Sequence, residues 1–104
     1  MNTQEIAAAP VPMLLQLDDQ VMIRRNLKHP AWMREVEADP RDGGAKWVPE
    51  EGIEEEIGVG RVIRICPASL FSRGEVLVAN GFWYDDITGS QVGSGATVIS
   101  RHTV

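Results

Sequence analysis

The chain has 104 residues, 43% hydrophobic and 24% charged, which is enough for one domain with a modest core. Its formal net charge of −5 disfavours a protein that coats nucleic acid with its whole surface, because phosphate binding needs an excess of Lys and Arg. No apolar run approaches the roughly 18–20 residues of a membrane span, so we expect no membrane partner. The single cysteine, Cys66, excludes an internal disulfide framework and suits a reducing compartment.

The first twelve residues predict a flexible N-terminal arm. Pro10 and Pro12 stop a helical turn and favour extended backbone. A secretory signal has a basic start and a longer apolar stretch than this one, which contains Glu5 and three alanines, so we expect a cytoplasmic protein. The predicted division is therefore an arm over 1–12 and a single small β-barrel domain over 13–104, with an excursion over 33–56.

Short alternating runs after the arm predict five strands, and no stretch has a sustained helical period. Asn80-Gly81 between two of these runs predicts a hairpin with a type I′ turn. In that register Leu77 faces Tyr84, while Val78 and Trp83 lie on the other side. The five predicted strands cover residues 21–25, 57–65, 75–79, 82–85 and 96–100.

Residues 33–56 interrupt this pattern with a long acidic excursion. The segment contains several glycines and prolines, and its residues 35–56 hold nine of the fifteen acidic residues against Arg41 and Lys46, for a net charge of −7. No strand-like alternation is sustained, so a long acidic loop is the main prediction, with a short strand around Trp47 as the alternative. Trp47 itself either folds back onto the barrel, which is the preferred interpretation, or stays exposed as a binding anchor.

These features favour an all-β fold. In so short a chain, a partly open five-stranded barrel protects strand edges better than a two-layer sandwich does. Gly58 and Gly60 are typical of the bends that close small barrels.

Two stretches carry a resemblance to known proteins. Leu17-Asp18-Asp19-Gln20-Val21-Met22-Ile23-Arg24, a long loop and then Val59-Gly60-Arg61-Val62-Ile63-Arg64-Ile65 resemble small barrels of the Src-homology-3-like (SH3-like) type. The tail, Phe82-Trp83-Tyr84-Asp85-Asp86-Ile87-Thr88-Gly89-Ser90-Gln91-Val92-Gly93, is similar to the endings of small uncharacterised phage and mobile-element proteins. The resemblance covers roughly residues 17–100 and implies a fold, but no activity.

No residue pattern indicates catalysis, so we expect a protein that is not an enzyme and has no cofactor. Cys66 could pair with His29 or His102, but it follows an apolar strand, where a thiol is usually inert. Two histidines and one cysteine give no zinc spacing. The glutamates of the excursion lack the Asp, Asn and Gly order of a calcium loop, so no metal site is predicted.

Charge is segregated along the chain, and this favours a protein-binding module. The predicted binding surface combines Trp47 with five acidic residues, Glu50, Glu51, Glu54, Glu55 and Glu56. A carboxylate-rich surface attracts a basic partner, and a basic nucleic-acid-binding host protein is the form of partner we expect. In the form that the phage resemblance suggests, the carboxylates would inhibit that protein by mimicking nucleic-acid phosphates.

Two alternatives remain open at this point. A basic strand face with an aromatic platform predicts a nucleic-acid-binding barrel through Arg24, Arg25, Lys28, Trp32, Arg61 and Arg64. The net charge ranks it below the protein-binding hypothesis. The other alternative is a virion structural or decoration protein, in which the arm or an unpaired strand edge would form a homo-oligomer.

Overall fold

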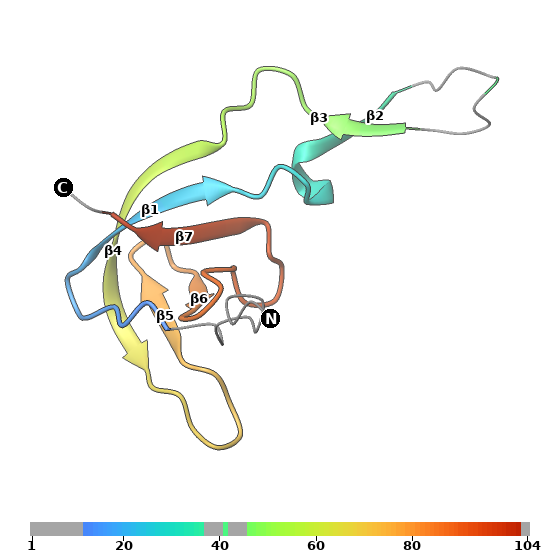
Figure 1. Ribbon diagram of the computed structural model, residues 1–104. Helices are drawn as coiled ribbons and strands as arrows, with labels where there is room; N and C mark the ends of the chain where they lie inside the picture. The colour runs from blue at the N-terminus through green and yellow to red at the C-terminus, as the bar shows by residue number, and fades with distance from the viewer. Residues whose placement is uncertain (1–11, 37–40, 42–45, 103–104) are drawn as a thin grey trace, which may run out of the picture.

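Alternating apolar residues build a five-stranded antiparallel sheet that curls into a half-barrel, in a computed structural model that describes residues 12–36, 41 and 46–102 (Figure 1). The strand order is β6-β5-β4-β1-β7. The strands are β1 (Gln20–Arg25), β4 (Glu56–Cys66), β5 (Glu75–Val78), β6 (Trp83–Asp85) and β7 (Thr97–Arg101). These five correspond to the five stretches predicted from the sequence, so the all-β prediction is confirmed.

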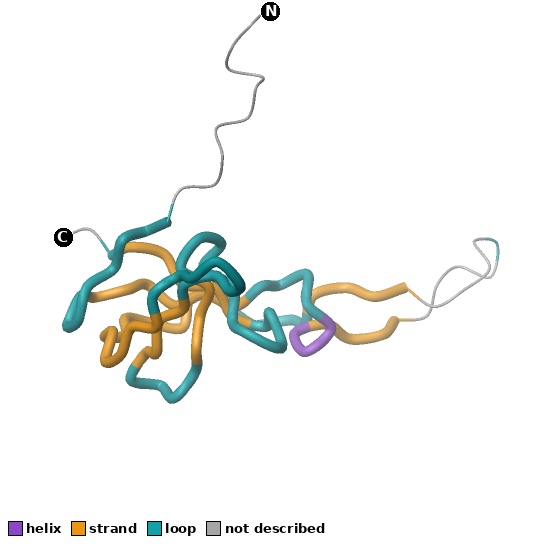
Figure 2. The backbone as a smooth tube through the Cα atoms, turned by 90° about the horizontal axis from the view of Figure 1, so that it is seen from below, coloured by secondary structure: helices purple, strands orange, loops and turns teal. Residues whose placement is uncertain are grey.

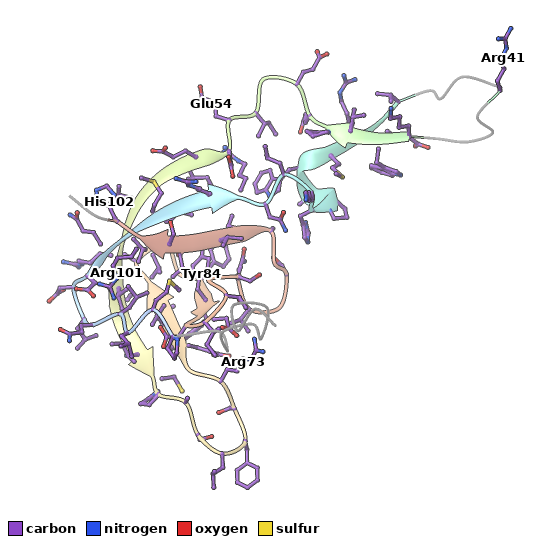
Figure 3. All side chains as sticks on the ribbon, in the orientation of Figure 1. Arg41, Glu54, Arg73, Tyr84, Arg101 and His102 are labelled. Atoms are coloured by element: carbon purple, nitrogen blue, oxygen red, sulfur yellow. The ribbon has the colours of Figure 1, made fainter. Side chains whose placement is uncertain are left out.

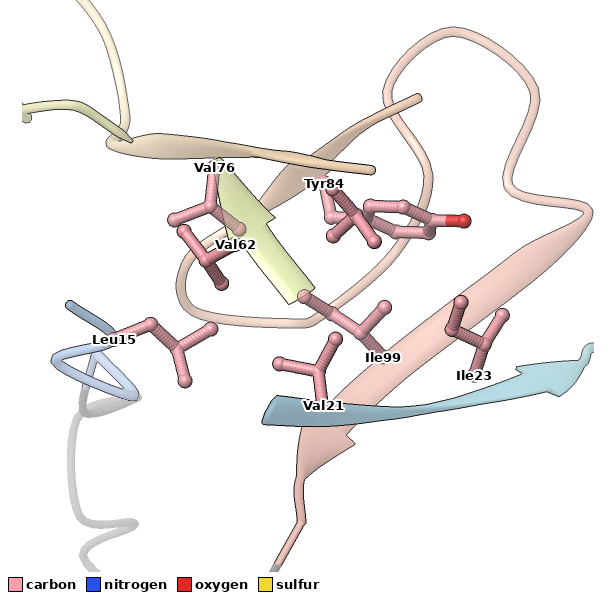
Figure 4. Packing of buried hydrophobic residues seen from close by; sticks show 8 residues of the cluster. Leu15, Val21, Ile23, Val62, Val76, Tyr84 and Ile99 are labelled. Atoms are coloured by element: carbon pink, nitrogen blue, oxygen red, sulfur yellow. The ribbon is translucent and has the colours of Figure 1, made fainter. Parts of the chain in front are cut away.

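The concave side of the sheet holds one hydrophobic core. Every strand contributes to it, because alternate residues of each strand point inward (Figure 4). Tyr84 is the largest of the fully buried side chains. The core consists of Leu15, Val21, Ile23, Val62, Val76, Val78, Tyr84 and Ile99.

A short segment between β6 and β7 joins the two edges of the sheet. Asp85 N–H donates to Ser90 O, and Val92 N–H donates to Trp83 O, on the β6 side. On the β7 side, Gln91 N–H donates to the carbonyl of Thr97. Residues 89–92 therefore occupy the place of a closing strand and leave fewer unpaired backbone groups at the edges.

Gly60 allows β4 to cross the core closely. A β-carbon at this position would lie 2.6 Å from Val78 Cγ1 and 2.9 Å from Ile23 Cδ1. The register of β4 also shifts by one residue against β1 and again against β5, and such bulges increase the local bend. The glycine and the bulges together explain how one eleven-residue strand serves both halves of the curled sheet.

The hairpin between β5 and β6 forms where the sequence predicts it, but its turn and register differ. Leu77 pairs with Trp83, and Val76 pairs with Tyr84, so the predicted pairing of Leu77 with Tyr84 is wrong. Gly81 has a φ of 92° whereas Asn80 does not have a positive φ, and Val78 N–H donates to Phe82 O. These features belong to a three-residue loop with a bulged glycine rather than a type I′ turn. The observed register places Val76, Val78 and Tyr84 on the core side together, and burial of that set decides the register.

The predicted long loop over 33–56 is wrong in part, because it contains a second, two-stranded sheet. Strand β2 (Met33–Val36) pairs antiparallel with β3 (Lys46–Pro49). Each strand has only four residues, too few for an alternation to stand out in the sequence. The hairpin projects away from the half-barrel in both views (Figures 1 and 2). The predicted N-terminal arm falls on residues 1–11, outside the described residues, and on Pro12.

Candidate protein-binding surface

The base of the projecting hairpin is attached to the half-barrel through Trp32. This residue ends the 3-10 turn Pro30–Trp32, and its carbonyl accepts a hydrogen bond of 2.9 Å from Glu50 N–H. Its indole Nε1–H donates to the carbonyl of Ala96, just before β7, at 2.6 Å. Trp32 thereby fixes the point from which the hairpin leaves the sheet.

Trp47 lies on the hairpin and not on the barrel. Its side chain is 56% exposed, and it is paired across the hairpin with Glu35. The interpretation that Trp47 folds back onto the barrel is therefore wrong, and the alternative of an exposed residue holds. Exposed tryptophan is unusual because the indole has a large apolar area, and tryptophan is enriched among residues that dominate binding energy.

The five predicted acidic residues follow Trp47 along the return path from the hairpin to β4. All are exposed, and Figure 3 shows Glu54 on the outer side of this connection. Glu51 pairs with Arg34 at 3.3 Å. Within the described part of the chain, no ion pair involves the carboxylates of Glu54, Glu55 or Glu56. We call Glu50, Glu51, Glu54, Glu55 and Glu56 the acidic segment.

Arg25 binds the backbone of the acidic segment and not its carboxylates. The guanidinium Nη1 donates to the carbonyl of Glu54 at 2.7 Å, and Arg25 N–H donates to the carbonyl of Glu55 at 2.6 Å. The same guanidinium lies over the Trp32 ring, 4.9 Å from its centroid, which is a cation–π contact. The acidic segment is therefore positioned by β1 while its negative charges face solvent.

The alternative basic surface is not one continuous stripe. Trp32 is occupied on its face by Arg25 and at its indole nitrogen by Ala96, so it offers no open platform for a base. Arg61 pairs with Asp18 at 3.8 Å and lies at the opposite end of β1 from Arg24, because its strand partner is Gln20. Arg24 and Lys28 are exposed and line one cavity with Arg25, which Glu55 also borders. Arg64 is exposed as well but does not line that cavity, because it lies near the end of β4.

The open side of the half-barrel contains an apolar cavity of about 410 Å³ that the sequence did not reveal. Its apolar lining comes from Ile23, Trp32, Ile57, Phe82 and Ala96, which belong to distant parts of the chain. No local pattern could have predicted it, since the cavity exists only where the curled sheet brings those parts together. We call it the apolar cavity.

Polar groups at the margin of the apolar cavity form a chain of hydrogen bonds. Asn80 Nδ2 donates to the Tyr84 hydroxyl at 3.0 Å, and the Thr97 hydroxyl donates to Gln91 Oε1 at 2.9 Å. The hydroxyls of Tyr84 and Thr97 are 2.8 Å apart. Because the Thr97 proton is used on Gln91, the Tyr84 hydroxyl must donate to Thr97, and every member of the chain has a partner.

The pKa values of two adjacent carboxylates at the end of β6, Asp85 and Asp86, are shifted in opposite directions. Burial alone would raise the pKa of Asp85, but hydrogen bonds from Thr88 and Ile87 N–H and the nearby Arg73 outweigh it and lower that pKa. Burial raises the pKa of Asp86, and the negative charge of Asp85 adds to the effect. One oxygen of Asp86, Oδ1, is buried without a hydrogen-bond partner. This pair is a feature of stability, and it lies away from both the hairpin and the acidic segment.

Comparisons with protein-family models, with curated proteins and with solved structures found no match. Within the described residues, the one helix is the three-residue turn Pro30–Trp32, far too short to cross a membrane. The described side chains form no group of three or more His, Cys, Asp or Glu residues that could hold a metal ion.

Proposed function

We propose that this chain is a non-enzymatic protein-binding module that captures a basic partner with its projecting hairpin and acidic segment. One observation carries the proposal: the carboxylates of Glu54, Glu55 and Glu56 are exposed and outside every ion pair of the described residues, close in sequence to the exposed Trp47. A two-stranded hairpin is only marginally stable alone in water, so a partner surface that covers it would stabilise both the hairpin and the complex.

The two parts of this surface have different roles in the proposal. Carboxylates steer a basic partner toward the surface and mainly affect the association rate, whereas a buried indole mainly slows dissociation. The association rate should therefore fall with salt, while the dissociation rate should depend on Trp47. In the finer form of the proposal, the half-barrel is an SH3-like module of phage or mobile-element type, and the carboxylates occupy the phosphate positions of a host nucleic-acid-binding protein.

The experiment that tests the proposal is capture of host proteins from a lysate by the immobilised chain. We compare wild type with the triple variant Glu54→Gln, Glu55→Gln, Glu56→Gln. The control is the triple variant Glu5→Gln, Asp18→Asn, Glu75→Gln, which removes the same charge from outside the acidic segment. Capture should be lost in the first variant and retained in the control. Equal capture by all three proteins would reject the acidic surface.

Two further measurements test the phosphate-mimic form of the proposal and the nucleic-acid-binding alternative. If the carboxylates mimic phosphates, added duplex DNA should displace the captured partner from the wild-type chain. The nucleic-acid alternative predicts instead that the chain itself binds DNA at low ionic strength, with an affinity that falls steeply as salt is added. Absence of that binding at low salt would eliminate the alternative.

A further inference from the structure

The connection between β4 and β5 presents two apolar side chains almost entirely to solvent. Leu70 is 96% exposed and Phe71 is 97% exposed, the highest values among the large apolar residues. They occupy the centre of a closed turn, because Ser69 N–H donates to Ser72 O at 2.9 Å and the two serine hydroxyls lie 3.0 Å apart. We call residues 69–72 the apolar turn.

The composition of the apolar turn is unusual. Central turn positions favour Gly, Pro, Asn, Asp and Ser, for reasons of backbone conformation and solvation. Here Ser69 and Ser72 occupy the two ends of the turn and hydrogen-bond to each other, and Phe71 N–H also donates to Ser69 Oγ at 3.2 Å. The local hydrogen bonds therefore hold Leu70 and Phe71 outward, away from the core. An apolar pair held in this way suits insertion into an apolar recess.

A recess of suitable size and chemistry lies on the same molecule. The apolar cavity, at about 410 Å³, lies within the range of about 300–1,000 Å³ for sites that bury small organic molecules. Two of its walls are accessible from outside, since Ile57 is 47% and Phe82 50% exposed. The ring of Phe71 and the side chain of Leu70 match this lining in chemistry.

The apolar turn of one chain cannot enter the cavity of the same chain. Ile57 lies at the start of β4, and the apolar turn follows Cys66 at its end. Nine residues of strand separate them, a path of about 30 Å at about 3.3 Å per residue. The β4–β5 connection also extends away from the sheet at the end opposite the hairpin (Figure 1). Figure 3 shows the same separation between Glu54 and Arg73. The occupant must therefore come from another molecule.

Charge near the two features is complementary. Arg73 directly follows the apolar turn but pairs with Asp85 at 3.3 Å, whereas Arg64, near the end of β4, has no ion pair among the described residues. Glu55 and Glu56 immediately precede Ile57 at the cavity. Arg25 also borders this end, where it stacks on Trp32, so apolar insertion rather than charge would supply most of the affinity.

We propose that the chain associates head to tail with further copies of itself, the apolar turn of one copy inserting Leu70 and Phe71 into the apolar cavity of the next. Such a heterologous contact generates a ring if the rotation closes and an open chain if it does not. An inserted aromatic side chain buries about 150–250 Å², well below the 1,200–2,000 Å² of stable interfaces. Each contact is therefore weak, and association appears only at high protein concentration.

The first test is sedimentation velocity of the wild-type chain from micromolar to near-millimolar concentration. The weight-average mass should rise with concentration for wild type and stay monomeric for Leu70→Ser, Phe71→Ser. Both residues are exposed, so that variant should keep the wild-type thermal midpoint. The matched control, Leu17→Ser, Val59→Ser, alters two other exposed apolar residues and should associate like wild type. A monomeric wild type, or unchanged association of the turn variant, would overturn the proposal.

Mixing separates a head-to-tail contact from a symmetric one. The variant Phe82→Glu places a charge in the cavity and keeps the apolar turn, so by itself it should be monomeric. Mixed with Leu70→Ser, Phe71→Ser at equal concentration, it should form dimers and nothing larger, because only one contact per pair is possible. A mixture that stays monomeric contradicts the head-to-tail contact. A second contradicting outcome is a wild-type chain that stays monomeric and pellets with phosphatidylserine vesicles through the apolar turn, because the turn would then bind a membrane and not a second copy.

Cross-linking reports which residues meet in the contact, because a disulfide traps even a briefly occupied contact. In a Cys66→Ser background, Ser72→Cys and Ser94→Cys place one thiol in the apolar turn beside the inserted pair and one on the cavity lining. Oxidation should give a ladder of covalent multimers from the double-cysteine chain, and dimers at most from either single cysteine. Absence of the ladder at concentrations where the wild type sediments as multimers would place the contact elsewhere.

Discussion

The hydroxyl groups of Tyr84 and Thr97 lie 2.8 Å apart, and they connect the β6 and β7 edges of the half-barrel through a side-chain hydrogen bond. Tyr84 is fully buried and Thr97 is 8% exposed, so neither group can replace its partner with bulk water. The bond also extends to Asn80 on one side and Gln91 on the other. This chain joins the β5–β6 turn, β6, the closing segment 89–92 and β7.

Removal of the tyrosine hydroxyl should therefore destabilise the fold without altering its shape. Tyr84→Phe leaves the buried Thr97 hydroxyl without a donor, whereas the exposed Asn80 can turn to water, and a buried unsatisfied group costs about 1–3 kcal/mol. We expect a loss of about that size in the free energy of unfolding, measured by urea denaturation. Ser100→Ala, at an exposed position of β7, should stay within about 0.5 kcal/mol of wild type. Equal stability of Tyr84→Phe and wild type would show that the network adds nothing.

Gly60 should tolerate no side chain while Val78 is present. A β-carbon there would lie 2.6 Å from Val78 Cγ1, so Gly60→Ala should destabilise the chain by about 1–3 kcal/mol through overpacking. Val78→Ala removes the nearer collision, and the remaining one, with Ile23 Cδ1 at 2.9 Å, involves the end of a flexible side chain. In a double-mutant cycle followed by urea denaturation, the double variant should be less destabilised than the two single effects added together. Simple additivity would mean that the collision is relieved by other movements.

Asp86 should limit stability at neutral pH. Its pKa is raised from the ordinary value of 3.8, so the folded state disfavours its ionised form. Its contribution to stability is present below that ordinary value and is lost as pH rises through the folded pKa. Asp86→Asn should therefore be more stable than wild type at pH 7, measured by urea denaturation, and the difference should vanish below about pH 3.8. A constant difference across this pH range would show that ionisation is not the cause.

Ionisation of Asp85 should stabilise the fold, the opposite of the effect at Asp86, because the pKa of Asp85 is lowered from 3.8. Its contribution is present above the ordinary value and is lost as pH falls through the folded pKa. Asp85→Asn should accordingly be less stable than wild type at neutral pH, in the same urea titrations. The difference should shrink in acid, and a variant as stable as wild type at pH 7 would contradict the role of the hydrogen bonds from Ile87 and Thr88.

Trp47 should dominate the accessible fluorescence of the chain. It is the one tryptophan among three with an exposed side chain, while Trp32 and Trp83 are half-buried. Trp47→Phe should remove the red-shifted part of the emission and most of the quenching by acrylamide, whereas Trp32→Phe should leave that quenching in place. Quenching that survives in Trp47→Phe would indicate that the hairpin covers Trp47 in solution. The same signal can report partner binding.

Local patterns accounted for most of the sheet and little of the surface around it. Val76, Val78 and Tyr84 alternate visibly, so the strands could be predicted, but the register of their hairpin could not, since Asn80-Gly81 fits more than one loop length. The apolar pair Leu70-Phe71 lies in a predicted loop, and its position there is a local signal of an exposed apolar feature. For Trp47 the sequence left two alternatives open, packing onto the barrel or exposure, and the structure shows exposure.

Alternation, turn residues and charge are properties of neighbouring residues, so the all-β class, the five strands of the half-barrel and the acidic segment follow from local sequence. The β2–β3 pairing, the closure of the sheet by residues 89–92 and the apolar cavity follow only from the folded arrangement. These features bring together residues far apart in the chain, such as Ile57 and Phe82 on the lining of the apolar cavity, and they form according to which apolar surfaces the curled sheet buries together.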